Sequence, residues 1–193
     1  MEETDKRAAV LRAAIEIVGE QGFHGAPMVQ IAERAHVGTG TIYRYFADKD
    51  AVIRAAVDQI QAGMLAAALA DYPAGEPVRT RFLHLANIWL RYAIDRPMEF
   101  RYLRQFMDSP YGIARRRAWL PGGSSSLLTD LFREGQEQKV IKELPALVLV
   151  ALGFEPLARI CADIINGLLA DEPRLIASTC DACWDALKRE PLT

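Results

Sequence analysis

The chain has 193 residues, of which 51% are hydrophobic, 25% charged and 8% aromatic, and its formal net charge is -2. This is the composition of an ordinary soluble globular protein, and it excludes a disordered, collagen-like or disulfide-stapled chain. The longest stretches without a charged side chain, such as residues 59–70, are shorter than the ~18 residues that a membrane span needs. With no signal-peptide pattern and three cysteines, the sequence predicts a cytoplasmic protein with no membrane partner.

Apolar residues recur with helical rather than alternating spacing, which predicts an all-α chain. The first helix is expected to follow a Thr4 or Asp5 cap, the second to begin at Pro27, and the fourth to begin after an Asp48 cap. A linker occupies residues 72–77. The expected helices with their approximate bounds are residues 5–19, 27–35, 39–46, 48–71, 78–96, 98–107, 111–119, 124–138, 144–169 and 174–189.

The second and third helices are short and separated by the turn His36-Val37-Gly38, the layout of a DNA-binding helix-turn-helix. On the third helix Val37, Ile42 and Phe46 are expected to point inward, which at 100° per residue turns Gly40 and Arg44 outward. A glycine lets the helix backbone approach a partner closely, and an arginine can bind guanine or a phosphate. Hydroxyl groups and one lysine complete the predicted DNA-binding set: Thr39, Gly40, Thr41, Tyr43, Arg44, Tyr45 and Lys49.

These residues carry a family resemblance. The stretch Gly22-Phe23, then Ile31 to Val37, then Gly40 to Phe46 and Lys49 resembles the N-terminal signature of the tetracycline-repressor (TetR) family. The resemblance implies a homodimeric transcription regulator, usually a repressor, whose C-terminal domain binds a small molecule and then releases the operator. It covers about residues 8–55, and the remainder is similar only in length, helix count and its two long closing helices.

The sequence departs from that signature at three places. Ala26-Pro27 replaces the hydroxyl residues at the start of the second helix, which removes a helix cap. His36 replaces a glycine in the turn and is expected to adopt the turn conformation with some strain. Gly38-Thr39 replaces a Ser-Lys pair, and so removes a positive charge.

The predicted architecture is a three-helix DNA-binding helix-turn-helix (residues 1–47) followed by a larger helical effector-binding and dimerisation domain (residues 48–193). The fourth helix is expected to couple the two. Aromatic and sulfur-containing side chains are candidates for the effector pocket: Phe82, Trp89, Tyr92, Phe100, Phe106, Met107, Trp119, Phe132 and Phe154. The apolar faces of the two closing helices are candidates for the dimer interface: Leu157, Cys161, Ile165, Ile176, Cys183 and Leu187.

Charge suggests what the effector could be. Residues 78–117 carry nine basic against three acidic side chains, while residues 118–193 carry seven against eleven. His84, Asn87 and Arg91 share one face of the central helix and could supply polar contacts. These features motivate the hypothesis of an anionic effector.

Cys180 and Cys183 lie one helical turn apart, but the interior of a helix with no nearby histidine favours core packing over redox or metal sensing. No metal or cofactor is predicted. An enzyme is disfavoured because the histidines, His24, His36 and His84, are scattered and no nucleophile with a base can be assembled. The alternative to an operator-binding regulator is a helical ligand- or partner-binding dimer that lacks specific DNA binding.

Overall fold

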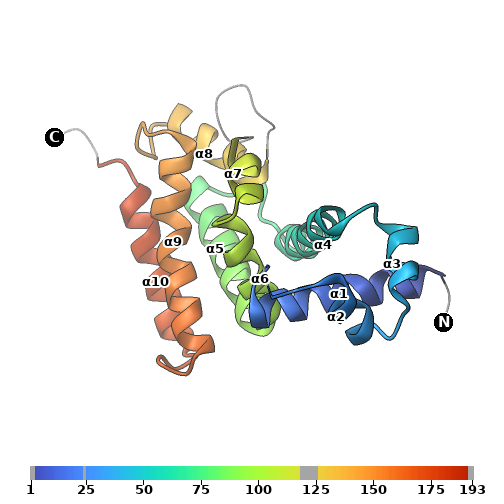
Figure 1. The fold of residues 1–193 in the computed structure, drawn as a ribbon. Helices are drawn as coiled ribbons and strands as arrows, with labels where there is room; N and C mark the ends of the chain where they lie inside the picture. Colours follow the sequence, from blue (N-terminus) through green and yellow to red (C-terminus); the bar gives the residue numbers. More distant parts are fainter. Residues whose placement is uncertain (1–2, 24, 118–125, 191–193) are drawn as a thin grey trace. The chain divides into compact units, whose positions relative to one another are not determined.

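The computed structural model describes residues 3–23, 25–117 and 126–190, and these residues form ten α-helices (Figure 1). The helices are α1 (Glu3–Gln21), α2 (Met28–Arg34), α3 (Thr39–Tyr45), α4 (Lys49–Leu69), α5 (Val78–Asp95), α6 (Pro97–Met107), α7 (Pro110–Arg116), α8 (Leu127–Glu137), α9 (Ala146–Ile165) and α10 (Pro173–Leu187). In these described ranges, extended pairing is limited to one bridge between Ile141 and Lys188. The prediction of an all-α fold is confirmed.

The helices pack into two compact units. The first comprises Met1–Leu65 and Arg96–Gly112, and the second comprises Ala66–Asp95 and Ile113–Thr193. The division therefore falls inside α4 and inside α7. Packing does not follow the functional boundary predicted at residues 47 and 48, because α6 belongs with the N-terminal helices; that functional boundary stays a prediction.

In the first unit, α1 is covered on more than one side, because α2, α3 and α6 all pack against it. The face predicted to be apolar is buried, and so is a second face: Leu11, Ala14, Ile15 and Val18, then Val10, Ala13 and Ile17. A helix that is apolar on two sides lies inside its unit rather than on the surface. Helix α1 is therefore the element on which the rest of the unit is built.

Helix α6 is fixed to this unit by hydrogen bonds as well as by apolar packing. The Gln105 side-chain amide donates to the carbonyl of Val18 at 2.8 Å, and the buried Tyr102 hydroxyl donates to the carbonyl of Ile53 at 2.9 Å. Burial raises the pKa of Tyr102, so that the hydroxyl keeps the proton it donates. One face of α6 thus contacts both α1 and α4.

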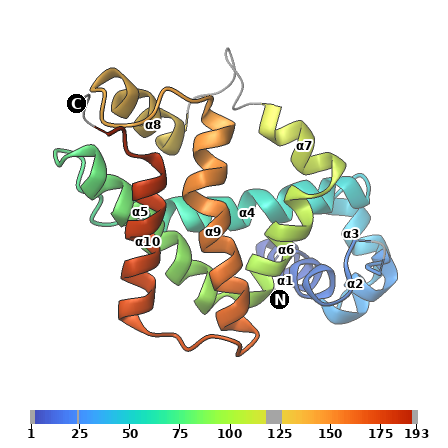
Figure 2. The same ribbon diagram turned by 90° about the vertical axis from the view of Figure 1, so that its left-hand side faces the viewer.

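Helix α5 contacts α8, α9 and α10 in the second unit, and α9 and α10 lie side by side (Figure 2). Fully buried side chains of α5, such as Phe82 and Leu90, lie in one core with residues of the other three helices. Close approach depends on Gly153 of α9, where a Cβ would come within 3.1 Å of Leu187 and 3.2 Å of Phe82. Bulk at this position would push α9 away from its neighbours.

Three ion pairs link basic residues of α5 to acidic residues of the segment after residue 118. Arg79 pairs with Asp181 at 2.6 Å, and Arg91 with Asp171 at 2.6 Å. Arg81 is 9% exposed and forms a two-pronged pair with Glu134, one prong being 2.8 Å long. Part of the uneven charge distribution in the sequence is therefore explained by pairing, within the chain, of basic residues of one segment with acidic residues of another.

Helix ends follow local signals, with two corrections. Asp48 caps α4 as predicted, its carboxylate accepting from the Ala51 amide at 2.7 Å. Helix α1 already begins at Glu3, so Thr4 and Asp5 lie within it rather than before it. The α8 cap is Ser126, which exchanges side-chain and backbone bonds with Thr129, rather than the predicted Ser124, which lies outside the described residues.

One helix of the described ranges, α4, is long and apolar enough to cross a membrane when judged by length and composition alone. Its buried apolar residues are Val52, Ile53, Ala56, Val57 and Ile60. These side chains pack inside the folded chain, whereas Leu65 and Leu69 near the end of α4 are exposed.

Candidate nucleic-acid interface and regulatory surfaces

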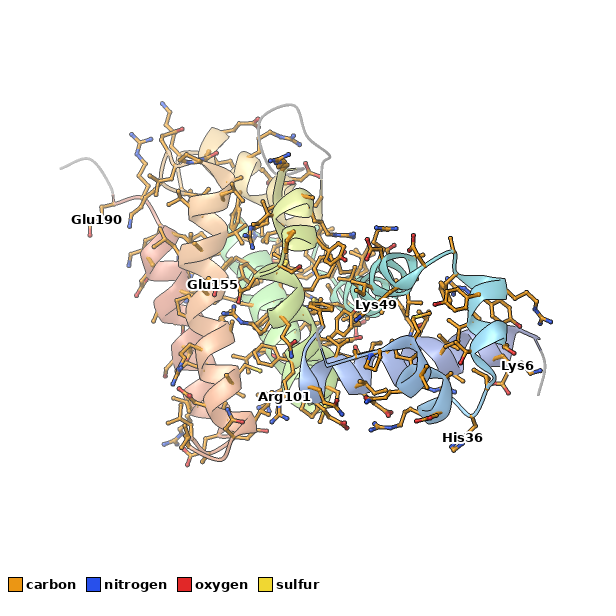
Figure 3. The ribbon with its side chains drawn as sticks, viewed as in Figure 1. Lys6, His36, Lys49, Arg101, Glu155 and Glu190 are labelled. Carbon is orange, nitrogen blue, oxygen red and sulfur yellow. The ribbon has the colours of Figure 1, made fainter. Side chains whose placement is uncertain are left out.

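The turn between α2 and α3 holds His36 in the left-handed conformation, with φ of 55°. A backbone bond from Val37 to the carbonyl of Ala32, 3.0 Å long, closes this turn. His36 is exposed and extends from the end of the turn (Figure 3). The strain expected where histidine replaces glycine is therefore present, because a Cβ crowds the following carbonyl in this conformation.

Helix α3 is anchored by two residues and exposes the opposite face. Ile42 is 0% exposed and Phe46 is 5% exposed, whereas Gly40, Tyr43 and Arg44 lie on the surface. Nothing lies within 4 Å of the position that a Cβ on Gly40 would occupy. The outward face predicted from helical spacing is thus the face that the structure leaves open.

The Arg44 side chain contacts its neighbour Tyr45. One guanidinium nitrogen donates to the tyrosine hydroxyl at 3.0 Å, and the guanidinium carbon lies 5.2 Å from the ring centre. This contact restricts the arginine rotamers before any DNA is bound. Thr39, Thr41 and Tyr45 are half-buried, so they offer less surface than Tyr43 and Arg44.

Lys49 has a structural partner that the sequence did not predict. Its ammonium donates to the carbonyl of Phe23 at 2.6 Å, which joins the start of α4 to the loop after α1. An ammonium has three donors, so this bond occupies one of them. Helix α2 begins at Met28, so Pro27, which was predicted to be its first residue, is the N-cap instead. It makes no side-chain cap bond, and the predicted loss of a cap is confirmed.

The predicted effector-pocket residues are divided between the two units. Phe82, Trp89, Tyr92, Phe132 and Phe154 belong to the second unit, whereas Phe100, Phe106 and Met107 belong to the first; Trp119 lies outside the described residues.

In the second unit, aromatic rings form a cluster. The Phe82 ring lies 5.8 Å from that of Phe154 and 5.7 Å from that of Trp184, and Trp89 lies 6.1 Å from Phe154. Trp184 is not among the pocket residues predicted from the sequence, although Cys180, Trp184 and Leu187 form an apolar stripe on α10 that could have indicated it.

Two of the three polar residues that share a face of α5 (His84, Asn87 and Arg91) are already bonded within the chain. A ring nitrogen of His84 lies 3.0 Å from the carbonyl of Ala68, and Arg91 is paired with Asp171. Among these three residues, only Asn87 is exposed and makes no hydrogen bond or ion pair with the described part of the chain. The charge argument for an anionic effector is weakened, because Arg79, Arg81 and Arg91 all have carboxylate partners.

The residues predicted for the dimer interface face the core of their own chain. Leu157, Cys161, Ile176, Cys183 and Leu187 are at most 2% exposed. The remaining one, Ile165, is half-buried. The apolar stripes of α9 and α10 are thus consumed in contacts within the chain, and a partner would have to contact other faces of these helices.

All three cysteines are reduced and buried. Burial raises the pKa of Cys161 to about 12 and that of Cys180 to about 11, and it also raises the pKa of Cys183. A neutral thiol is a poor nucleophile and a poor metal ligand. This environment favours the core-packing interpretation over sensing.

Matches to protein families agree with this geometry. Residues 10–56 match the bacterial regulatory proteins of the tetR family, and residues 60–189 match the tetracyclin repressor-like C-terminal domain. The chain belongs to the TetR family of transcriptional regulators, and its N-terminal helix-turn-helix is a DNA-binding module. The matches point to a regulator rather than to an enzyme.

Individual relatives are similar over different lengths. HTH-type transcriptional regulator UidR of Escherichia coli is 42% identical over 60 residues, which is 31% of each chain. An HTH-type regulator of Haemophilus influenzae is 21% identical over 96% of this chain and 97% of its own. The chain aligns with only a fifth to a third of the length of the first curated relatives, HbdR and UidR.

Solved structures share the whole fold. A TetR-family regulator from Marinobacter aquaeolei superposes with a TM-score of 0.85 at 24% identity, covering 97% of both chains. One from Haemophilus influenzae gives 0.79 at 18% identity, covering 96% of this chain and 98% of the other.

Proposed function

We propose that this protein is a ligand-responsive transcriptional repressor that binds a palindromic operator as a homodimer and is released by a small-molecule effector. The observation that carries the proposal is α3, whose Gly40, Tyr43 and Arg44 are exposed together while Ile42 and Phe46 hold the helix in place. An anchored helix with an open polar face suits the major groove.

The effector is proposed to bind in the second unit, beside the aromatic cluster of Phe82, Trp89, Phe154 and Trp184. Aromatic side chains with a few polar groups are the usual lining of small-molecule sites. Release of DNA requires that the effector bind more tightly to the dimer shape in which the two recognition helices are wrongly spaced.

The homodimer is proposed to form through the outer faces of α9 and α10, which include Ala151, Glu155, Ala177 and Ala182. Small side chains let helices of two copies approach closely in a four-helix bundle with two-fold symmetry. Substitution of Ala182 with glutamate is expected to shift the protein towards monomer, as measured by sedimentation. An unchanged sedimentation coefficient would place the interface elsewhere.

The central test is selection of binding sites from random duplex DNA at near-physiological salt, with Arg44→Ala in parallel. Enrichment of a palindrome that the variant does not enrich supports specific recognition through α3. Absence of enrichment by the unaltered protein, with and without candidate effectors, would favour the ligand- or partner-binding dimer without specific DNA binding.

A further inference from the structure

Arg7, the fifth residue of α1, lies beside the end of α3. Arg7 is exposed, and its guanidinium carbon lies 5.3 Å from the centre of the Phe46 ring. Phe46 is the C-cap residue that follows α3, and it is 5% exposed. Lys6, the neighbour of Arg7, lies at the same end of the first unit (Figure 3).

Two other cations of the first unit are held by oxygen acceptors within the chain. Arg34 pairs with Glu16 and Glu20 at 3.2 Å, and Lys49 donates to the carbonyl of Phe23. Arg7 is instead positioned by an aromatic ring. A ring contacts the flat face of a guanidinium, and therefore leaves the N–H groups at its edge directed outward for a second acceptor.

Two adjacent aromatic residues thus hold two guanidinium groups at the end of α3: Tyr45 holds Arg44 and Phe46 holds Arg7. The outer face of α3 enters the groove, so a cation on α1 at the end of that helix reaches the backbone rather than the bases. A guanidinium binds a phosphate through two parallel N–H bonds.

We propose that Arg7 is a DNA-contacting residue that binds a backbone phosphate flanking the bases read by α3, with Phe46 as its positioning residue. The proposal rests on the proposed operator binding. It also gives the first unit a phosphate contact in a region where the sequence lacks the usual lysine before Gly40.

The test compares Arg7→Gln with Arg12→Gln, binding being measured on the selected operator and on a scrambled duplex at several salt concentrations. Arg12 is an exposed arginine of the same helix, five residues on and therefore about 140° around it, so the two variants lose the same charge. Arg7→Gln is expected to weaken binding to both duplexes alike, by about fivefold per subunit at about 0.15 M salt. It should also reduce the slope of the logarithm of the binding constant against the logarithm of the salt concentration by about one per subunit. Arg12→Gln is expected to retain the slope of the unaltered protein.

Arg7→Lys keeps the charge and is expected to retain most of the salt dependence of binding. This variant therefore distinguishes loss of the charge from a loss caused by misfolding. Equal slopes for Arg7→Gln and Arg12→Gln, or a change of the preferred sequence in Arg7→Gln, would overturn the proposal. If the unaltered protein bound neither duplex, operator binding itself would fail; binding by the unaltered protein with no effect at Arg7 would reject only the phosphate contact.

Discussion

His36 occupies a backbone conformation that costs an L side chain about 1–2 kcal/mol, and the turn of the helix-turn-helix requires it. Substitution with glycine removes the clash but adds freedom to the unfolded chain, at a cost of about 0.5–1 kcal/mol. We therefore expect His36→Gly to stabilise the protein by about 0.5–1 kcal/mol, measured as a rise in the midpoint of urea unfolding. Glu33→Gly, inside α2, is the control and is expected to lower that midpoint; a lower midpoint in His36→Gly would contradict the strain.

Arg44 and Lys49 are expected to differ in what they contribute to DNA binding. Arg44→Ala should relax sequence preference, because a guanidinium reading a base discriminates by about 1–3 kcal/mol. Lys49→Ala should weaken all DNA alike and also lower thermal stability, since it loses the bond to the Phe23 carbonyl. Titration of operator and scrambled duplexes, with a melting curve for each variant, separates these effects. Equal loss of specificity in both variants would be inconsistent with these roles.

At the scale of elements, the pair between Arg81 of α5 and Glu134 of α8 has a defined pH dependence. The hydrogen bond from Arg81 lowers the pKa of Glu134 below its ordinary value of 4.5. A carboxyl group whose pKa is lower in the folded chain stabilises the fold above that ordinary value, and the stabilisation is lost as the pH falls through the lowered pKa. The contribution is therefore complete at neutral pH.

Glu134→Gln should lower stability at pH 7 by about 1 kcal/mol, because it leaves the nearly buried Arg81 without its counter-charge, while solvent screens Glu134, whose side chain is 38% exposed. The difference between variant and unaltered protein should shrink as the pH is lowered below about 4.5. Chemical unfolding at pH 7 and pH 3.5 measures this difference in the free energy of unfolding, with Glu137→Gln on the exposed side of α8 as the control. A difference independent of pH would refute the linkage.

Helix positions could be predicted wherever a local signal marks them. Asp48 caps α4 as predicted, and the helix expected over residues 98–107 is α6, which begins one residue earlier. The outward face of α3 followed from helical geometry alone. The packing partners could not be predicted in this way, because nothing in residues 96–112 indicates that α6 joins α1, which is far away in sequence. For the same reason the dimer residues were placed on apolar faces that the chain itself buries.

At the scale of the whole molecule, the first unit is assembled from two distant segments. A fragment ending at Leu65 lacks α6, and with it the bonds from Gln105 to Val18 and from Tyr102 to Ile53. It would also expose apolar surface of α1. We expect this fragment to be largely unfolded at 25 °C. Circular dichroism during heating should show no cooperative transition for the fragment, in contrast to the full chain. A sharp melting transition in the fragment would show that α1, α2, α3 and the part of α4 up to Leu65 fold stably without α6.

The buried thiols have a practical consequence for such experiments. Cys161, Cys180 and Cys183 are at most 3% exposed, and raised pKa values keep them protonated at neutral pH. Maleimide dyes react with accessible thiolates, so the native protein should remain unlabelled until it is denatured. A single cysteine introduced on the surface of α3 could then carry a fluorophore without removal of the native ones. In the proposed homodimer, the distance between the two copies of α3 could be followed directly as a candidate effector is added.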